Sequence, residues 1–132
     1  MGERVVSTPL VLGDRIIFVT LIPNTDPCTP GGDSWVMQVS ALTGGAPASS
    51  VFDFNNDEAF NDVDRYNLNV VSGIKSTVGI GKTPVVLTKD TSTGYLEMAG
   101  STGGVMKVKT SLPLDPSLPS GSTSRVYWMQ IQ

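Results

Sequence analysis

The chain has 132 residues, a formal net charge of −3 and no histidine. A length of this size suits one domain with a modest core. The nine Lys and Arg residues are scattered, which excludes a phosphate-binding patch, and the absence of histidine excludes Ser-His-Asp and Cys-His catalytic pairs and imidazole-bound zinc. We therefore expect a protein that is not an enzyme and does not bind nucleic acid.

Alternation of apolar and polar residues with a period of two predicts strands through the first half of the chain. Gly13-Asp14 has the composition of a two-residue hairpin turn. The strand that follows it is apolar on both faces, which indicates a place in the middle of a sheet or between packed sheets, and Pro9 suggests an edge or a bulge in the strand before it. The strands predicted here are 4–12, 15–22 and 34–40.

The second half shows the same alternation, and no capped run of period 3.6 predicts a helix. Segment 65–71 is ambiguous between a strand and an irregular crossover; as a strand it would turn Leu68 and Val70 inward. A proline-rich crossing, 112–119, leads to the last strand. The strands predicted here are 50–54, 73–80, 82–88, 95–99, 105–110 and 125–131.

The predicted fold class is all-β, with antiparallel sheets that resemble the last blades of a modified β-propeller. Two blade-like blocks, 1–52 and 72–132, flank a loop and crossover at 53–71. A strand pattern that begins almost at once after Met1 suggests a fragment of a larger protein. Open sheet edges in such a fragment could pair with a second copy. No apolar run approaches the ~18 residues of a membrane span.

The most informative motif is acidic. Five of the 12 acidic residues lie in 53–64, and none of the nine Lys and Arg does. The segment reads D-x-N-x-D-x-x-x-N-x-x-D, which is the ligand spacing of a twelve-residue calcium loop. Calcium prefers six to eight oxygen ligands, so such a loop must fold back and point its oxygens inward. The pattern therefore predicts a Ca²⁺ site.

The spacing assigns a role to each position. Side-chain oxygens come from positions 1, 3, 5 and 12, a main-chain carbonyl from position 7, and a direct or water-mediated contact from position 9. The predicted metal ligands are Asp53, Asn55, Asp57, Ala59, Asn61 and Asp64. Phe52 and Phe54 are expected to anchor the loop against the core.

Two residues depart from the usual loop. Position 6 turns with a positive φ and normally carries glycine, but here it is Glu58, and position 12 is Asp64 rather than glutamate. The alternative interpretation is an acidic surface turn with Asx hydrogen bonds and no metal.

Three other features have structural interpretations. Gly79-Ile80-Gly81-Lys82-Thr83 ends like a phosphate-binding loop, but the first glycine of that motif would fall at Ser76, so we predict a strand edge with a glycine bend. Trp35 and Trp128 lie on alternating strands and are expected in the core. The single cysteine, Cys28, lies in a Pro/Gly-rich loop and is either a free thiol or paired outside this segment.

Several segments together resemble the C-terminal domain of the PilY/PilC-type proteins of bacterial type IV pili. The most specific combination is a strand ending in TLIPNTDPC, at 20–28, followed by GGDSW at 31–35. The other matching segments are 2–9, 15–19, 41–45 and 125–130.

The resemblance implies the end of a modified β-propeller in a tip-associated biogenesis factor and adhesin. Such proteins work at the cell surface or pilus tip of Gram-negative bacteria with minor pilins, support pilus assembly, oppose retraction and contribute to attachment to surfaces and host ligands. It also implies calcium control through the acidic loop at 53–64, and an oxidising compartment that favours a disulfide at Cys28. The alternatives are a purely structural propeller segment and a carbohydrate-binding module with a groove formed by Trp35 and Trp128.

Overall fold

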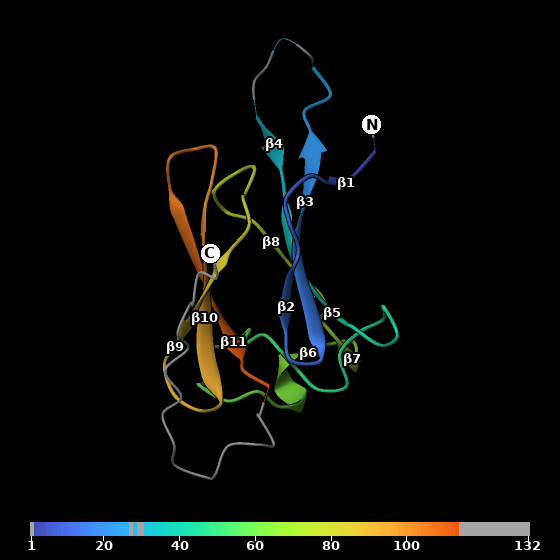
Figure 1. The fold of residues 1–132 in the computed structure, drawn as a ribbon, viewed down its shortest axis with the longest axis vertical. Coiled ribbons are helices and arrows are strands. Elements are labelled where there is room, and N and C mark those ends of the chain that lie inside the picture. Colours follow the sequence, from blue (N-terminus) through green and yellow to red (C-terminus); the bar gives the residue numbers. More distant parts are fainter. Residues whose placement is uncertain (1, 27, 29–30, 114–132) are drawn as a thin grey trace, which may run out of the picture.

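The computed structural model describes residues 2–26, 28 and 31–113, and they form antiparallel sheets (Figure 1). The predicted all-β class is confirmed. The strands are β1 (Arg4–Val5), β2 (Leu10–Leu12), β3 (Arg15–Pro23), β4 (Gly32–Asp33), β5 (Trp35–Ser40), β6 (Arg65–Tyr66), β7 (Asn69–Val70), β8 (Gly73–Lys75), β9 (Val85–Thr88), β10 (Thr93–Ala99) and β11 (Val105–Ser111). The one helix in this part of the chain is a 3-10 turn, η1 (Asp62–Asp64).

Strand β3 is the centre of a six-stranded sheet with the order β1-β3-β5-β8, in which β2 and β4 also pair with β3. The Gly13-Asp14 turn joins β2 to β3 as predicted, because Leu12 pairs with Arg15 and Gly13 has a φ of +60°. Segment 4–12 is extended but interrupted before Leu10, so β1 and β2 pair with separate parts of β3. The central position explains why β3 is apolar on both faces.

A second sheet has the order β11-β10-β9. Its longest pairing joins β10 and β11 from Thr93↔Ser111 to Ala99↔Val105, around the glycine-rich turn at 100–104. Short antiparallel pairing between β6 and β7 forms a separate hairpin just after the acidic loop.

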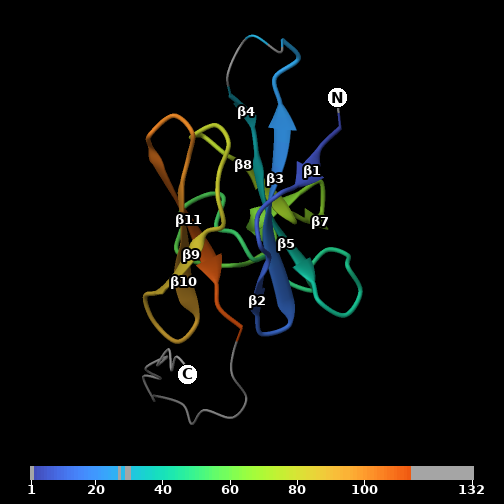
Figure 2. The ribbon, with the colours of Figure 1, turned by 45° about the horizontal axis from the view of Figure 1, so that its top comes forward.

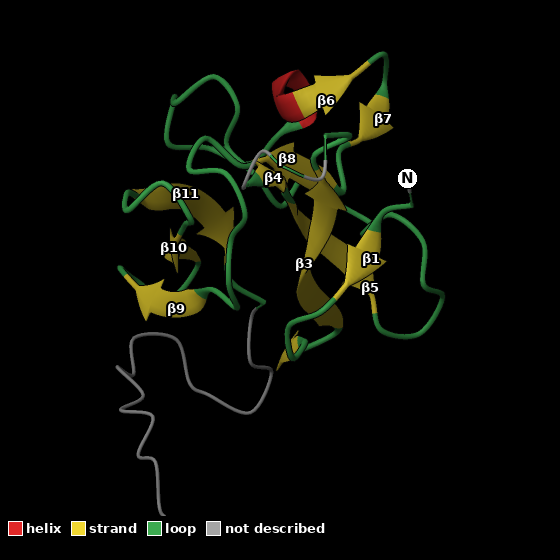
Figure 3. Ribbon diagram, turned by 90° about the horizontal axis from the view of Figure 1, so that it is seen from above, coloured by secondary structure: helices red, strands yellow, loops and turns green. Residues whose placement is uncertain are grey.

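The two main sheets lie side by side and enclose the core between them (Figures 2 and 3). Figure 3 shows β9, β10 and β11 on one side and β1, β3 and β5 on the other. Burial of each large apolar side chain contributes about 1.5–3 kcal/mol, so this shared core is what holds the sheets together. Its buried members are Ile17, Val19, Val36, Val51, Phe52, Val78, Leu96, Met98, Met106 and Val108.

A polar seam also crosses between the sheets. Gln38 of β5 donates from Nε2 to Thr110 Oγ1 of β11 at 2.8 Å, and both residues are fully buried. Arg15 of β3 donates from Nη1 to Gln38 Oε1 at 3.3 Å and to Ser111 Oγ at 3.1 Å. Thr110 in turn donates to the Val51 carbonyl at 3.0 Å. We call Arg15, Gln38, Thr110 and Ser111 the polar seam.

Two of the predicted strands, 50–54 and 73–80, need correction, and the ambiguous segment 65–71 can now be described. Segment 50–54 is not a strand: it makes a single bridge, Phe52↔Thr110, because the chain turns into the acidic loop. Segment 65–71 is a tight hairpin, and Leu68 at its tip has a φ of +65° and is 88% exposed, so it does not face inward. The strand predicted at 73–80 ends at Lys75 because the chain bends away at 77–80.

Three more predictions concern the last strand, the glycine bend near Gly81 and membrane spans. The strand predicted at 125–131, with Trp128, lies outside the described residues. The chain bends at 77–80, where Gly79 has a φ of +73°, and Gly81 makes a bridge to Gly100. No helix follows Gly81 up to residue 113, where the described part of the chain ends, so the glycine bend is confirmed. In the ranges that the structure describes, no helix has the length and hydropathy needed to cross a bilayer.

Candidate metal centre

The acidic loop leaves the core at Phe52, which bridges to Thr110 of β11, and ends in η1, directly before β6 (Figure 1). Phe52 is 1% exposed, whereas Phe54 is 47% exposed and touches Phe52 edge-on with ring centroids 6.4 Å apart. The predicted anchor is therefore Phe52 alone, and Phe54 only rests on it.

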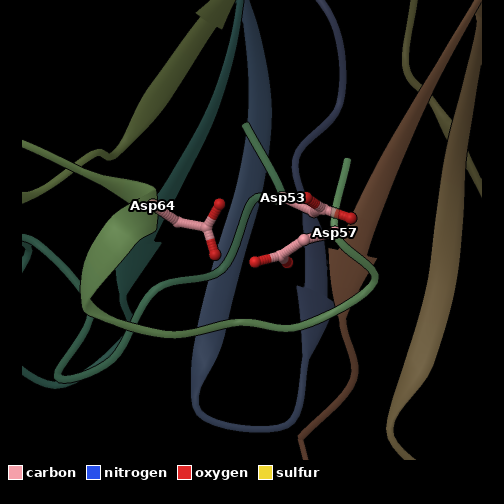
Figure 4. A group of neighbouring side chains, drawn as sticks. All are labelled: Asp53, Asp57 and Asp64. Carbon is pink, nitrogen blue, oxygen red and sulfur yellow. The ribbon is translucent and has the colours of Figure 1, made fainter. Parts of the chain in front are cut away.

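Three carboxylates meet inside the loop (Figure 4). One oxygen each of Asp53, Asp57 and Asp64 lies within 4.8 Å of the others. These residues occupy positions 1, 5 and 12 of the predicted calcium loop. Three anionic groups this close repel one another in a medium less polar than water, so the arrangement favours a cation between them.

Asp53 is the most constrained of the three. Its side chain is 0% exposed, and its Oδ2 accepts hydrogen bonds from the Glu58 amide at 3.1 Å and from Lys109 Nζ at 3.1 Å. Its Oδ1 is buried without a hydrogen-bond partner. Buried polar atoms nearly always have a partner, so this oxygen needs an explanation.

The chain winds around these side chains through Asx hydrogen bonds. Asn55 Oδ1 accepts from the Asp57 amide at 3.0 Å, and Asp57 Oδ1 accepts from the Ala59 amide at 2.9 Å. Asn55 Nδ2 also donates to Asp57 Oδ2 at 2.8 Å. The pKa of Asp57 is lowered, first by the Ala59 amide and then by Asn55, with Asn61 and Lys109 contributing less. Asp57 is thus held as an anion.

Asp64 closes the loop at its other end. It is 2% exposed, and its Oδ1 and Oδ2 accept from the amides of Phe54 at 2.8 Å and Asn61 at 3.1 Å. Asn61 caps η1 by accepting from the Val63 amide at 2.8 Å, which completes a reciprocal capping box. This one carboxylate therefore ties the two ends of the loop together.

Glu58 adopts the conformation that position 6 requires. Its φ is +69°, and its amide points to Asp53 as described above. A non-glycine residue in this region carries a strain of about 1 kcal/mol or more. Asn56 also has a positive φ, +58°, which asparagine tolerates better. The loop therefore has the backbone turn of the predicted motif in spite of the unfavourable residue.

Two lysines, one on β11 and one directly after β9, contact the loop. Lys109 Nζ lies 3.1 Å from Asp53 Oδ2 and 3.8 Å from Glu58 Oε1, and Lys89 Nζ lies 3.5 Å from Glu58 Oε2. Burial alone lowers the pKa of Lys109, but the hydrogen bond to Asp53 and the charges of Glu58 and Asp53 together raise it. Lys109 therefore stays protonated and lies beside the carboxylate cluster as an ammonium ion.

The structure brings together three of the six predicted ligands, Asp53, Asp57 and Asp64. The side chain of Asn55 is bonded to Asp57, and Ala59 contacts Asp57 through its amide. Asn61 is held through both its amide, which donates to Asp64, and its side chain, which accepts from the Val63 amide. Sequence reasoning did not identify Lys109, because a lysine on an alternating strand 45 residues further along has no local signal that relates it to the loop.

The structure also places two other residues that the sequence analysis singled out, Trp35 and Cys28. Trp35 on β5 is half-buried, and its proposed partner in a groove, Trp128, lies outside the described residues. Cys28 is exposed, and its amide donates to Asp26 Oδ1 at 2.9 Å.

Comparison with known proteins finds similarity to type IV pilus biogenesis factors. The chain is 31% identical over 131 residues to a type IV pilus biogenesis factor PilY1 homolog of Xylella fastidiosa (strain Temecula1). The aligned region covers 98% of this chain and 10% of that protein. It is 32% identical over 80 residues to the type IV pilus biogenesis factor PilY1 of Pseudomonas aeruginosa (strain UCBPP-PA14), covering 61% of this chain and 7% of that protein.

The chain thus spans a tenth or less of the length of these curated relatives. No family model matches it, and no solved structure does. Similarity along 98% of the chain confirms the predicted resemblance: the chain is similar to a segment of the PilY1-type type IV pilus biogenesis factors.

Proposed function

We propose that this chain is a calcium-binding, non-enzymatic β module of a type IV pilus biogenesis factor. The relatives are named for pilus biogenesis, which supports the setting. The acidic loop with its three converging carboxylates supports the metal. In this proposal 1–52 and 72–132 are two blade-like blocks of a C-terminal propeller segment, and 53–71 is the calcium loop and crossover. The blocks do not coincide fully with the sheets, because β8 of the second block pairs into the first sheet.

The observation that carries the metal is Asp53 Oδ1. It is buried, has no hydrogen-bond partner and belongs to the carboxylate that also meets Asp57 and Asp64. An acidic surface turn without metal gives no reason to bury an oxygen and leave it unsatisfied, because water would serve an exposed one. A cation ligated by this oxygen removes the penalty.

The residues that would hold calcium are those of the predicted motif: Asp53, Asn55, Asp57, Ala59, Asn61 and Asp64. All of them offer oxygen, which suits a hard cation, and the Asx bonds described above leave the loop wound before any ion arrives. The bound ion would cancel the repulsion among Asp53, Asp57 and Asp64 and fix the loop against β11.

The functional consequence that we propose is that calcium orders the acidic loop at the protein surface. A loop fixed by calcium would present a defined face to minor pilins or other tip components, or to a host ligand, in a protein exported to the cell surface or pilus tip. In that oxidising setting the exposed Cys28 could pair with a cysteine outside this segment. We propose roles in pilus assembly, retraction control and attachment on this basis.

Calcium titration of the chain, followed by calorimetry and thermal melting, tests the metal. We expect heat of binding and a stabilisation of about 2.7 kcal/mol at a hundredfold excess over the dissociation constant. Magnesium is the ion control, because it demands a tighter octahedral site and loses its water reluctantly. We expect a much smaller response to it.

The matched variants are Asp57→Asn and Asp62→Asn. Asp57 is exposed, so its loss should not unfold the domain, but it belongs to the cluster. Asp62 lies in the same loop and carries the same charge, yet it pairs with Arg65 at 2.9 Å and its side chain is 87% exposed. Loss of binding in Asp57→Asn alone supports the proposal. Absence of heat and of any melting shift in the unmodified chain refutes it, and the structural segment or carbohydrate module would then be the better description.

A further inference from the structure

Lys109 occupies an unusual place for a lysine. It lies on β11, its side chain is only 10% exposed, and its ammonium contacts the fully buried carboxylate of Asp53. Most lysine side chains reach into water, and a nearly buried one needs a partner. Here the partner is position 1 of the candidate calcium loop.

The ammonium contacts only one side of that carboxylate. Lys109 Nζ is bonded to Asp53 Oδ2, while Asp53 Oδ1 stays without a partner. Lysine has three donors and no acceptor, so it can balance the charge of Asp53 but cannot enter the ligand shell of a metal. The two oxygens of Asp53 therefore serve different cations.

We infer that Lys109 is the internal counter-ion of the loop: it balances Asp53 when no metal is bound and thereby lowers the affinity of the site for calcium. This inference rests on the calcium site proposed above. It assigns the determinant of affinity to a residue outside the twelve-residue motif.

Two effects of Lys109 act in the same direction. In the calcium-free protein the ammonium stabilises a carboxylate that would otherwise be buried with its charge unbalanced. In the calcium-bound protein the same ammonium lies beside a divalent cation and repels it. Lys109 thus stabilises the free state and disfavours the bound state, and both effects weaken calcium binding while keeping the empty loop folded.

Glu58 moderates this effect. Its carboxylate lies 3.8 Å from Lys109 and 3.5 Å from Lys89, and it is held there by a strained backbone with φ of +69°. A glycine at this position would relieve the strain but would provide no negative charge near the two lysines. The residue that departs from the motif is thus part of the electrostatic balance around the site.

The test compares Lys109→Met with Lys107→Met in the full 132-residue chain. Lys107 lies two residues away on the same strand, but it pairs with Glu97 at 3.4 Å and stacks on Tyr95 at 4.2 Å and does not contact Asp53. With a chelator present, we expect Lys109→Met to melt roughly 10 °C below the unmodified chain and Lys107→Met to melt within about 2 °C of it.

With calcium, Lys109→Met should bind about tenfold more tightly than the unmodified chain, and Lys107→Met within about twofold of it. If Lys109→Met does not fold in chelator, its folding on addition of calcium alone supports the inference. Lys109→Gln, which is neutral but can still donate to Asp53, then gives the affinity of a folded variant, and we expect a gain of about threefold.

The outcomes separate the two proposals. If the unmodified chain does not bind calcium, the proposed function fails and this inference fails with it. If the unmodified chain binds calcium, but Lys109→Met and Lys109→Gln bind it equally or more weakly, the calcium site stands and the counter-ion role is overturned.

Discussion

The polar seam and the acidic loop both bury a charged side chain, but they treat it differently. In the seam, Arg15 is 5% exposed and donates to Gln38 and Ser111, and burial lowers its pKa. In the loop, Asp53 is bonded through one oxygen and not through the other. A buried charge whose neighbours satisfy it is part of the architecture, whereas one left partly unsatisfied indicates a ligand.

Phe52 lies where these two regions meet, and removing it should have the largest effect. It is 1% exposed and bridges to Thr110 of the seam. We expect Phe52→Ala to lower the free energy of unfolding by about 4 kcal/mol, through the lost burial and the cavity left behind. Denaturant unfolding measures this. Phe54→Ala is the control and should cost about 1 kcal/mol or less, because that ring is 47% exposed. Equal losses would show that both rings anchor the loop.

Gln38→Ala separates stability from calcium binding. The change leaves Arg15 without its partner on β5 and Thr110 without its donor, so we expect a loss of about 2 kcal/mol in unfolding free energy. Calcium affinity should remain within about twofold of the unmodified chain, since the seam is not part of the metal site. A large change in affinity would mean that the seam and the loop are one coupled unit.

Glu58→Gly tests the strain in the loop. Relief of the positive φ should raise the unfolding free energy by about 0.5–1 kcal/mol, offset in part by loss of the exposed ion pair to Lys89. Calcium binding should weaken slightly, because Lys109 loses a neutralising charge. Asn56→Gly is the control and should gain less stability, since asparagine already tolerates its φ of +58°. A net loss in Glu58→Gly larger than in Asn56→Gly would show that the ion pairs outweigh the strain.

The smallest expected effect is on the loss of stability at acid pH, through Asp90. The pKa of Asp90 is lowered, chiefly by the Ser92 amide and also by that of Thr93, both of which donate to its Oδ1 in the turn before β10. A carboxylate with a depressed folded-state pKa stabilises the fold above its unfolded pKa of about 4, and this stability is lost as the pH falls through the folded value. Melting curves should therefore show a slightly shallower acid loss for Asp90→Asn than for the unmodified chain. Identical pH profiles would contradict this.

Much of the fold could be predicted from local pattern. The Gly13-Asp14 turn, the central strand β3 and the β10–β11 hairpin follow from alternation and turn residues alone. Segment 50–54 could not be predicted correctly, because its apolar residues serve to hold a loop against another sheet, and that partner lies at Thr110. The expectation that Leu68 faces inward was wrong because this residue has a positive φ in a tight turn, a conformation that an apolar residue rarely adopts.

The candidate site shows the same limit. The spacing of Asp53, Asp57 and Asp64 predicted which carboxylates would converge. The burial of Asp53 and the approach of Lys109 depend on tertiary packing between the loop and β11 and leave no trace in the motif. Local sequence thus predicts which carboxylates converge, while the burial of Asp53 and the lysine beside it come from the fold.

Diffraction from crystals grown in calcium, recorded where calcium scatters anomalously, tests the central claim most directly. We expect an anomalous peak bounded by Asp53, Asp57 and Asp64, with oxygens at about 2.3–2.6 Å and Asp53 Oδ1 among them. A loop that holds only water between these carboxylates at saturating calcium would contradict it.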